Sequence, residues 1–273
     1  MEPGIYYDIS HEDYLKLDAL SASRLKDFRK SPAHYKHSLE NPKSQTDAML
    51  LGSFVHALVL EPAKVVDKYL SLPELDYRSP KNREIRDNLI AENPGVTFLK
   101  QDDWQKGFDV SRTVLANKRV DKILSGAKVE VSAVFEIEEI LCKARFDIWN
   151  QEIGVIADIK TCQDASFNSF ARNAYQRGYH FQAAWYREAA KILGHDLKGF
   201  AIVAVETNEP YGVKVYEVSP PDMDKAIEQT RKHIQLYRDC KATNSWPSYG
   251  EDIEVLTLPT WADEPTENME VRQ

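Results

Sequence analysis

The chain has 273 residues, of which 42% are hydrophobic and 10% are aromatic. This length and composition allow a sizeable core, in one large domain or in two small ones. The 35 basic and 43 acidic residues give a net charge of −8, which offers no general attraction to a polyanion. The apolar stretch at 52–60 is far shorter than the roughly 20 residues of a membrane span, and the N-terminal MEPGIYYDIS lacks a basic and then hydrophobic signal pattern. We therefore expect a cytoplasmic protein with no membrane partner.

The cysteines exclude several kinds of site. Cys142, Cys162 and Cys240 are odd in number, widely spaced and without a CxxC pair. This pattern argues against disulfides, a structural zinc and a four-cysteine iron-sulfur cluster. We expect three buried, reduced thiols.

Charge is unevenly distributed along the chain. Residues 251–273 hold seven acids and one base, so this tail carries −6 and residues 1–250 carry −2. Two segments, 20–37 and 77–86, are locally basic. Their bases are Arg24, Lys26, Arg29, Lys30 and Lys36 in the first, and Arg78, Lys81, Arg83 and Arg86 in the second. Such segments can meet a polyanion locally, although each one alone is equally well explained as a solvated helix face.

The first predicted elements are helices. Ser21 suits the N-cap of a helix over 22–30, which Ser31-Pro32 ends because proline disfavours helical geometry before it. A second helix is predicted from about 46 to 60, ending at Glu61-Pro62. Prolines divide residues 63–100 into short mixed pieces, to which we assign no mechanism. Residues 102–124 are predicted to form one longer helix.

After Gly126 the apolar period changes to two, which indicates strands. The strand at 129–137 has Val129, Val131, Ala133, Phe135 and Ile137 on one face and Glu130, Ser132 and Glu136 on the other. The strand at 141–149 has Cys142, Ala144, Phe146 and Ile148 on one face and Lys143, Arg145 and Asp147 on the other. A third strand follows at 155–161, VIADIKT. Three strands with short connections predict an antiparallel meander.

The remaining elements complete the expected architecture. Helices are predicted at about 166–176 and 179–193, strands at 199–206 and 213–218, and a last helix opens at Ser219-Pro220. This order predicts an α/β or α+β fold, with a mixed central sheet flanked by helices. We expect a single domain over 1–250, with its core at about 46–240 and a helical segment at 1–45. The acidic tail at 251–273 is expected to be a flexible solubilising segment.

Asp158 and Lys160 form the centre of a candidate site. They are two residues apart in a strand, so their side chains leave the same face. Asp147 reaches that face if its strand is the neighbour. Close carboxylates repel unless one is protonated or a cation lies between them, and hard oxygen ligands favour magnesium or manganese. The alternative is a structural ion pair, which for a short DxK pattern alone is the more frequent explanation.

Companion residues strengthen the metal-site interpretation. In GSFVH, Gly52 and His56 lie one helical turn apart, and the histidine suits an inward-pointing ligand. In QAAWY, Gln182 and Tyr186 share one helix face. Each pattern alone is ordinary, as a core histidine or an amphipathic helix.

Taken together, GxxxH, an aspartate that closes a strand (CKARFD), DxK and QxxxY occur in the order and spacing of RecB-type nucleases of the PD-(D/E)XK superfamily. The segments GIYYDISHEDY, LSASRLKDFRKSPAHY, GSFVHALVLEP, VEVSAVFE, CKARFDI and DIKT resemble the nuclease domains of the RecE (exonuclease VIII) type and their phage relatives. The resemblance covers about residues 4–220. It implies a restriction-endonuclease-like core.

The resemblance also implies roles for individual residues. His56, Asp147, Asp158 and the Ile159 carbonyl would bind Mg²⁺, for which Mn²⁺ can substitute. Lys160 would be the catalytic lysine. Glu130 would hold a second metal or its water, and Gln182 and Tyr186 would support the site. Ser23 and Arg24 would contact the 5′ phosphate, so that 1–45 binds a DNA end. ARF before Asp147 replaces a glycine-containing turn common in the wider superfamily, but the acid itself is retained.

The implied function is a Mg²⁺-dependent exonuclease that digests one strand of duplex DNA from its 5′ end. The 3′ overhang would serve a single-strand annealing protein of the RecT/Bet type, in the cytoplasm of a bacterial host cell. A ring-shaped homo-oligomer, a trimer or tetramer, would enclose the DNA. Alternatives are an endonuclease or repair nuclease of the same superfamily, a non-catalytic DNA-end-binding module, and an unrelated metal-dependent phosphoesterase.

Overall fold

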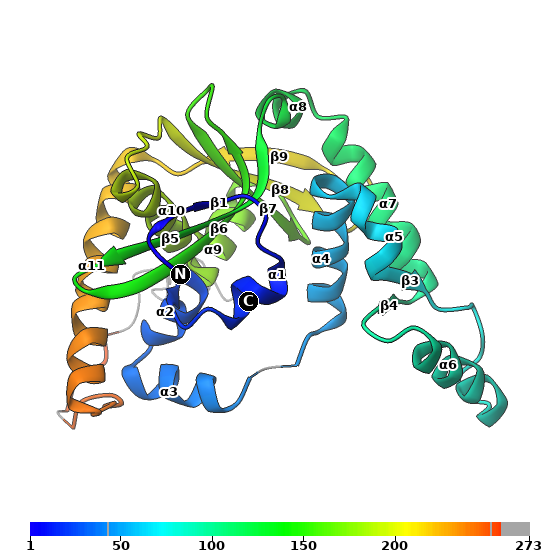
Figure 1. Cartoon of the computed structure of the whole chain (residues 1–273), viewed down its shortest axis with the longest axis horizontal. Coiled ribbons are helices and arrows are strands. Elements are labelled where there is room, and N and C mark those ends of the chain that lie inside the picture. The colour runs from blue at the N-terminus through cyan, green and yellow to red at the C-terminus, as the bar shows by residue number, and fades with distance from the viewer. Residues whose placement is uncertain (43, 252, 258–273) are drawn as a thin grey trace, which may run out of the picture.

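The structure is a computed structural model, and it describes residues 1–42, 44–251 and 253–257 (Figure 1). The strands are β1 (Gly4–Tyr6), β2 (Leu20–Ser21), β3 (Tyr69–Ser71), β4 (Thr97–Leu99), β5 (Lys128–Ile137), β6 (Ile140–Asn150), β7 (Val155–Cys162), β8 (Gly199–Glu206) and β9 (Val213–Glu217). The helices are α1 (His11–Lys16), α2 (Ala22–Phe28), α3 (Pro32–Glu40), α4 (Asp47–Leu60), the 3-10 turn η1 (Pro62–Lys64), α5 (Val65–Lys68), α6 (Pro80–Glu92), α7 (Gln101–Leu115), α8 (Lys118–Leu124), α9 (Phe167–Arg177), α10 (Tyr179–Ile192) and α11 (Pro220–Thr243).

A mixed seven-stranded sheet forms the centre of the fold, with its strands in the order β1-β5-β6-β7-β8-β9 and β2 paired to β6. β5, β6 and β7 form the predicted antiparallel meander. β8 lies parallel to β7 and is reached through α9 and α10. Helices cover both faces of the sheet (Figure 1), so the predicted α/β fold with a mixed central sheet is confirmed.

The two faces of the sheet carry separate apolar cores. On one face, α10 packs against β5 and β6 and contacts α2 and α11, and Phe135 and Trp185 are fully buried there. On the other face, α4, α7 and α8 cover the sheet, and Val55, Val110 and Ile159 are fully buried. The strand between the cores is buried on both sides, which explains why β7 is apolar almost throughout.

The side chains of β5 and β6 were predicted to alternate strictly between the two faces of the sheet. This prediction is wrong at one position on each strand. Phe146 packs into the core beside α10, but Ile148 packs into the core beside α4. Val131 and Val129 on β5 are divided between the two cores in the same way. Between the two valines, Glu130 has a φ of 53°, a left-handed conformation that interrupts the extended backbone. Both strands therefore change faces beside the acids of the candidate site.

Two predicted helices differ from those observed. The single helix predicted over 102–124 is wrong, because the chain forms α7 and α8 instead. The side chain of Asn117 accepts hydrogen bonds from the N–H groups of Arg119 and Val120, at 3.0 and 3.3 Å, and so caps a new helix. The helix predicted over 22–30 ends at Phe28, and α3 follows directly with Ser31 as its N-cap and Pro32 in its first turn.

The mixed stretch at 63–100 forms an arm that projects from the body (Figure 1). β3 and β4 pair in a small parallel sheet, and α6 lies between them in sequence with no buried residue. The base of the arm is held by an aromatic cluster in which Phe54 stacks on Trp104 at 4.8 Å between ring centroids and contacts Tyr69 at 5.2 Å.

Three other expectations concern the whole chain. Cys142, Cys162 and Cys240 are buried and free, as predicted. Within the described ranges, no helix is long and apolar enough to cross a membrane. Most of the acidic tail lies outside the described residues, so its prediction stays untested.

Candidate active site

The candidate site begins where β6 and β7 separate. The two strands pair from Asn150 opposite Val155 to Ile148 opposite Ala157, and regular pairing ends there. At the next position, the Ile159 N–H donates instead to Oδ2 of Asp147 at 3.0 Å. A side chain thus takes the place of a backbone acceptor, and the Asp147 carboxylate lies in the opening between the two strands.

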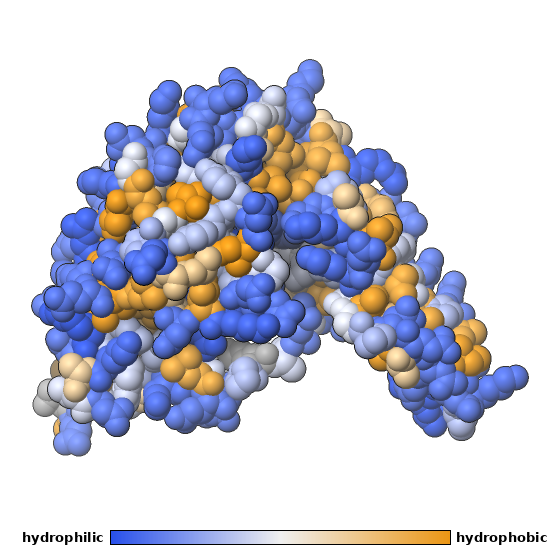
Figure 2. Space-filling view, viewed as in Figure 1, coloured by the Kyte–Doolittle hydropathy of each residue, from blue (hydrophilic) through white to orange (hydrophobic). Residues whose placement is uncertain are grey.

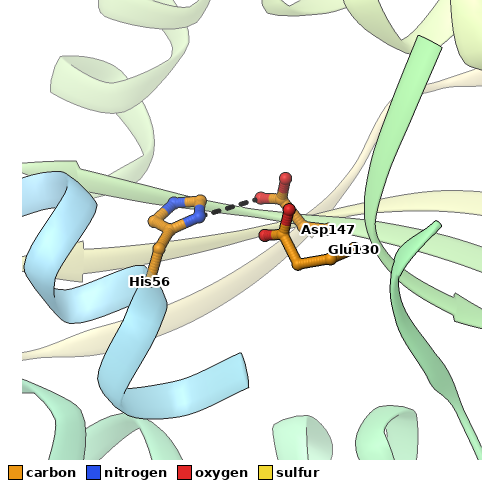
Figure 3. Close-up of side chains that lie close together, drawn as sticks. All are labelled: His56, Glu130 and Asp147. Atoms are coloured by element: carbon orange, nitrogen blue, oxygen red, sulfur yellow. Dashed lines mark ion pairs between the residues drawn. The ribbon is translucent and has the colours of Figure 1, made fainter. Parts of the chain in front are cut away.

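Helix α4 brings His56 to this opening. Its Nε2 lies 2.6 Å from the Ile159 carbonyl oxygen and its Nδ1 lies 3.4 Å from Oδ2 of Asp147 (Figure 3). A carbonyl oxygen only accepts hydrogen bonds, so the first contact places a proton on Nε2. A Cβ atom on Gly52, one turn earlier, would lie 3.2 Å from Oγ1 of Thr161. Glycine therefore lets α4 approach β7 closely enough for this contact.

Glu130 enters the site from β5. It lies beside Asp147 and His56, and one potential ligand atom from each of the three residues falls within 4.8 Å of the others (Figure 3). Arg145 holds the Glu130 carboxylate through Nε at 2.5 Å. Nη1 of Arg145 also donates to Oγ of Ser132 at 2.8 Å. Glu130 and Ser132 both belong to β5, and they lie on the same face of the sheet as the Arg145 side chain. The left-handed backbone at Glu130 is what turns this carboxylate toward the histidine.

Asp158 and Lys160 leave the same face of β7, as predicted. Their side chains form an ion pair, and Oδ1 of Asp158 accepts a hydrogen bond from Nε2 of Gln182 at 2.6 Å. The same Nε2 lies 2.9 Å from the hydroxyl of Tyr186. Gln182 and Tyr186 thus orient the Asp158 carboxylate, as the helix spacing indicated. Asp158 is outside the three-residue group of His56, Glu130 and Asp147, because it is turned toward Lys160.

Burial and crowding of charges shift the acid-base behaviour of the site. Burial, reinforced by the negative charge of Asp158, raises the pKa of Asp147 to about 7, while His56 and Lys160 act in the opposite direction. For Lys160, burial alone would lower the pKa, but Asp158 and Asp147 outweigh it and raise the pKa above its usual value. The lysine is therefore held as an ammonium.

The donor set fits a divalent cation. Oδ2 of Asp158 is buried, and its partner among the described residues is the Lys160 ammonium of the ion pair. Nδ1 of His56 lies 3.4 Å from Oδ2 of Asp147, so a cation between them would meet an imidazole nitrogen and a carboxylate oxygen. Carboxylates, one imidazole and the carbonyl of Ile159 are ligands that Mg²⁺ and Mn²⁺ accept. The residues present would therefore hold such an ion at the opening between β6 and β7.

Two contributors were missed by the sequence reasoning. Arg145 stood only as a polar-face residue of β6, and the left-handed backbone at Glu130, the acid that it contacts, gave no signal in the sequence. The ring of Tyr179 lies with its centroid 5.0 Å from Nζ of Lys160. Tyr179 is the first residue of α10 and lies three residues before Gln182. It therefore shares a helix face with the QxxxY pattern, and this spacing could have identified it.

Ser23 and Arg24, the residues expected at a 5′ phosphate, lie on α2 and are exposed. Ser23 hydrogen-bonds through Oγ to Oγ of Ser21 at 3.0 Å, and Arg24 forms no ion pair within the part of the chain described. No contact joins them to His56 or the carboxylates. The N-terminal segment is nevertheless tied to β6, because Nζ of Lys143 donates to the carbonyl oxygens of residues 14, 15 and 17 at 2.9, 3.2 and 2.7 Å.

A mixed sheet that carries two aspartates, a glutamate and a lysine where its strands separate defines the PD-(D/E)XK class. The model of the family described as "PDDEXK-like domain of unknown function (DUF3799)" matches residues 21–259, and the chain belongs to this family. The superfamily resemblance found in the sequence is thereby confirmed.

One solved structure agrees with this assignment at the level of the fold. A protein from Eubacterium rectale named "putative exonuclease" is 16% identical with a TM-score of 0.63, over 92% of this chain and 96% of that one. A phage related exonuclease from Haemophilus somnus 129PT is also 16% identical, over 85% of this chain and 99% of that one, with a TM-score of 0.38. No curated protein matches the chain. At these identities the first likeness shows the fold alone, and the second adds no argument.

Proposed function

We propose that this chain is a Mg²⁺-dependent nuclease that digests one strand of duplex DNA from its 5′ end and leaves a 3′ overhang. The observation that carries the proposal is the grouping of Glu130, Asp147, Asp158 and Lys160 where β6 and β7 separate, with His56 beside them. Membership in a PDDEXK-like family and the exonuclease name of the Eubacterium rectale neighbour support it.

Each side chain has a role in this reaction. A divalent cation held by these carboxylates and His56 would supply Lewis-acid polarisation of the scissile phosphate and an activated water. The Lys160 ammonium donates to the charge that builds on the phosphoryl oxygens, and its neighbouring carboxylates keep it protonated for this task. Gln182 and Tyr186 fix the orientation of Asp158. Arg145 does the same for Glu130.

The shape of the molecule is compatible with a duplex substrate. The two basic segments found in the sequence, 20–37 and 77–86, lie on α2–α3 and on the arm at α6, at two separate lower ends of the molecule (Figure 1). The space-filling view shows a notch between these two parts (Figure 2). Helix α4, which carries His56, lies between them. Phosphates of a duplex held in the notch would meet basic side chains on either side.

Three further parts of the proposal rest on the family resemblance. Ser23 and Arg24 would bind the 5′ phosphate, and the overhang would pass to a single-strand annealing protein. A ring-shaped trimer or tetramer would surround the DNA and account for processive digestion. The reaction would take place in the cytoplasm of a bacterial host cell.

Linear duplexes labelled at the 5′ end or at the 3′ end, together with covalently closed circles, test the proposal. With Mg²⁺ present, we expect early release of the 5′ label, late release of the 3′ label and intact circles. Cutting of the circles would favour an endonuclease or repair nuclease of the same superfamily. Binding of ends without any cleavage would instead favour a non-catalytic end-binding module.

A further inference from the structure

Helix α9 presents an aromatic and basic face that the proposed catalytic groups leave unexplained. Phe167 and Tyr175 are 70% and 69% exposed, although large aromatic side chains normally contribute to a core. They stand eight residues apart with the exposed Ala171 midway, so the three residues follow one side of the helix. Phe170, three residues after Phe167, is the buried residue that packs α9 into the core, so the helix does not need its exposed aromatic residues to stay attached.

The ring of Tyr175 is held in a fixed orientation with one side open. It stacks on the ring of His180 with an interplanar angle of 3° and 5.5 Å between centroids. His180 in turn contacts Phe181 at 4.4 Å, and the Arg29 guanidinium covers the Phe181 ring at 3.9 Å. Because His180 supports only one side of the Tyr175 ring, the high exposure of the tyrosine means that its other side is free for a planar group.

The charge around these rings is positive. No acid occurs between Asp164 and Glu188, although the whole chain has a net charge of −8. Arg172 and Arg177 are exposed and form no ion pair within the described residues. A ligand that supplies flat rings together with a row of negative charges therefore matches this face.

The face also adjoins the catalytic lysine. Tyr179 follows α9 by two residues, and its ring lies 5.0 Å from Nζ of Lys160. Phe167 and Tyr175 are about 12 Å apart along the helix axis, from the rise of about 1.5 Å per residue. This separation corresponds to about three to four stacked nucleotides at about 3.4 Å each.

We infer that the outer face of α9 binds unpaired nucleotides of a single nucleic-acid strand, with Tyr175 and Phe167 as stacking residues and Arg172 and Arg177 near the phosphates. The position of this strand beside the scissile phosphate rests on the proposed function, but the binding itself does not. Stacking on aromatic rings combined with a basic track is the usual basis of sequence-independent single-strand binding.

Fluorescence anisotropy with a labelled 12-nucleotide oligothymidylate tests the inference on the full chain, with EDTA added so that no cleavage occurs. We expect the Phe167→Ala/Tyr175→Ala double variant to bind at least about tenfold more weakly than the unmodified chain. Tyr175→Trp is expected to retain or strengthen binding. Arg172→Gln is expected to reduce the slope of log affinity against log salt by about 0.7.

Tyr249→Ala is the matched control, because Tyr249 is 70% exposed but lies elsewhere, in contact with His34. Circular dichroism verifies that every variant is folded. The inference is overturned if the unmodified chain does not bind the oligonucleotide, if the double variant changes affinity by less than about twofold, or if Tyr249→Ala loses as much.

Two further outcomes separate the possible causes. If the double variant alters the oligomeric mass and not oligothymidylate binding, the face is an interface between copies and the inference is wrong. If single-strand binding depends on Tyr175 but the labelled duplexes are never cut, the inference stands and the proposed nuclease function fails.

Discussion

Oδ2 of Asp147 accepts a hydrogen bond from the Ile159 N–H at 3.0 Å, at the first position beyond the last regular pair of β6 and β7. One carboxylate oxygen therefore replaces the backbone acceptor that a continued sheet would provide. The same oxygen lies 3.4 Å from Nδ1 of His56. The separation of the strands and the assembly of the candidate metal site are thus one structural feature, and substitutions at Asp147 should affect both.

The acid-base state of Asp147 should be visible as a pH dependence of stability in the metal-free protein. Burial first, and then the charge of Asp158, raises the pKa of Asp147 to about 7 in the folded chain, against about 3.9 in an unfolded one. The folded state therefore binds the extra proton between these values, and the stability that the proton contributes is lost as pH rises through about 7.

In EDTA we expect the midpoint temperature of thermal unfolding to decrease as the pH is raised from about 5 to about 8. The corresponding loss of free energy of unfolding is on the order of a few kcal/mol. Asp147→Asn should flatten this dependence. Added Mg²⁺ or Mn²⁺ should stabilise the protein more at pH 8 than at pH 6, because the ion and the proton compete for the same carboxylate. Differential scanning calorimetry measures all three effects, and an equal pH dependence in Asp147→Asn would contradict the assignment.

Lys160 should be needed for turnover but not for DNA binding. Lys160→Ala removes the ammonium that the proposed mechanism places at the scissile phosphate, so we expect cleavage of labelled duplex to fall at least about a hundredfold. The affinity for duplex in EDTA should change by less than about threefold, since one phosphate contact among many is lost. Lys191→Ala, on the exposed side of α10, is the matched control and should retain full activity. Unchanged turnover in Lys160→Ala would remove this residue from the mechanism.

Strand periodicity and motif order were sufficient to predict that Asp147, Asp158 and Lys160 meet on neighbouring strands. Both features act over short distances in sequence: the DxK pair is set by a period of two, and the meander follows from short connections. The role of Arg145 was not predictable in this way. It depends on the left-handed backbone at Glu130, and strict alternation does not anticipate a residue with positive φ inside a strand.

Helix boundaries were likewise predictable where local signals set them. α4 was predicted correctly because Thr46 caps it and Pro62 follows its end, and both signals are local. The break between α7 and α8 was missed because the apolar period continues through it, and the side chain of Asn117 overrides that period. The arm at 63–100 was not predictable, since it is held by an aromatic contact to a residue distant in sequence, that of Tyr69 with Phe54.

Removing one partner of the Glu130–Arg145 ion pair should lower the free energy of unfolding strongly, whereas replacing both partners should lower it much less. Their side chains are 19% and 10% exposed, and Arg145 also donates to the Ile9 carbonyl at 3.0 Å. Arg145→Met leaves an unpaired carboxylate in a largely buried position, so we expect a loss of about 3–5 kcal/mol. The Arg145→Met/Glu130→Gln double variant should recover much of this loss.

Urea unfolding measures both free energies, and a double-mutant cycle with Glu130→Gln completes the comparison. Equal stability of Arg145→Met and the double variant would show that the ion pair carries no coupling. Lys232→Met is a suitable control, because its ion pair with Glu228 on α11 is exposed and screened by solvent, so its loss should change the free energy of unfolding very little.

Gln182 should act on the metal through Asp158. Its Nε2 lies 2.6 Å from Oδ1 of Asp158 and 2.9 Å from the Tyr186 hydroxyl, and no other amide contacts that carboxylate in the described part of the chain. Gln182→Leu keeps the size of the side chain but loses the donor. We expect about 10- to 100-fold weaker Mn²⁺ binding, measured by titration calorimetry. Tyr186→Phe retains the Gln182–Asp158 hydrogen bond and should weaken Mn²⁺ binding less than Gln182→Leu does. Weaker Mn²⁺ binding by Tyr186→Phe than by Gln182→Leu would contradict this arrangement.

Gly52 should set the distance between α4 and β7. A Cβ atom there would lie 3.2 Å from Oγ1 of Thr161, so Ala already tightens the contact and Leu cannot be accepted without a shift of the helix. His56 lies one turn further along α4, and its Nε2 to Ile159 O distance of 2.6 Å leaves no tolerance for such a shift. Leu is a good helix former, so Gly52→Leu tests packing rather than helix propensity.

We expect Gly52→Leu to lower cleavage of labelled duplex by about a hundredfold, the loss associated with a displacement of about 1 Å. The Mn²⁺ affinity should fall with it, because His56 moves away from Asp147. Gly52→Ala should have a smaller effect, and Gly52→Ala/Thr161→Ala should return to near-normal activity, since the second substitution removes the hydroxyl that the new methyl group meets. If Thr161→Ala fails to rescue Gly52→Ala while both variants remain folded, the close approach of α4 to β7 is not what positions His56.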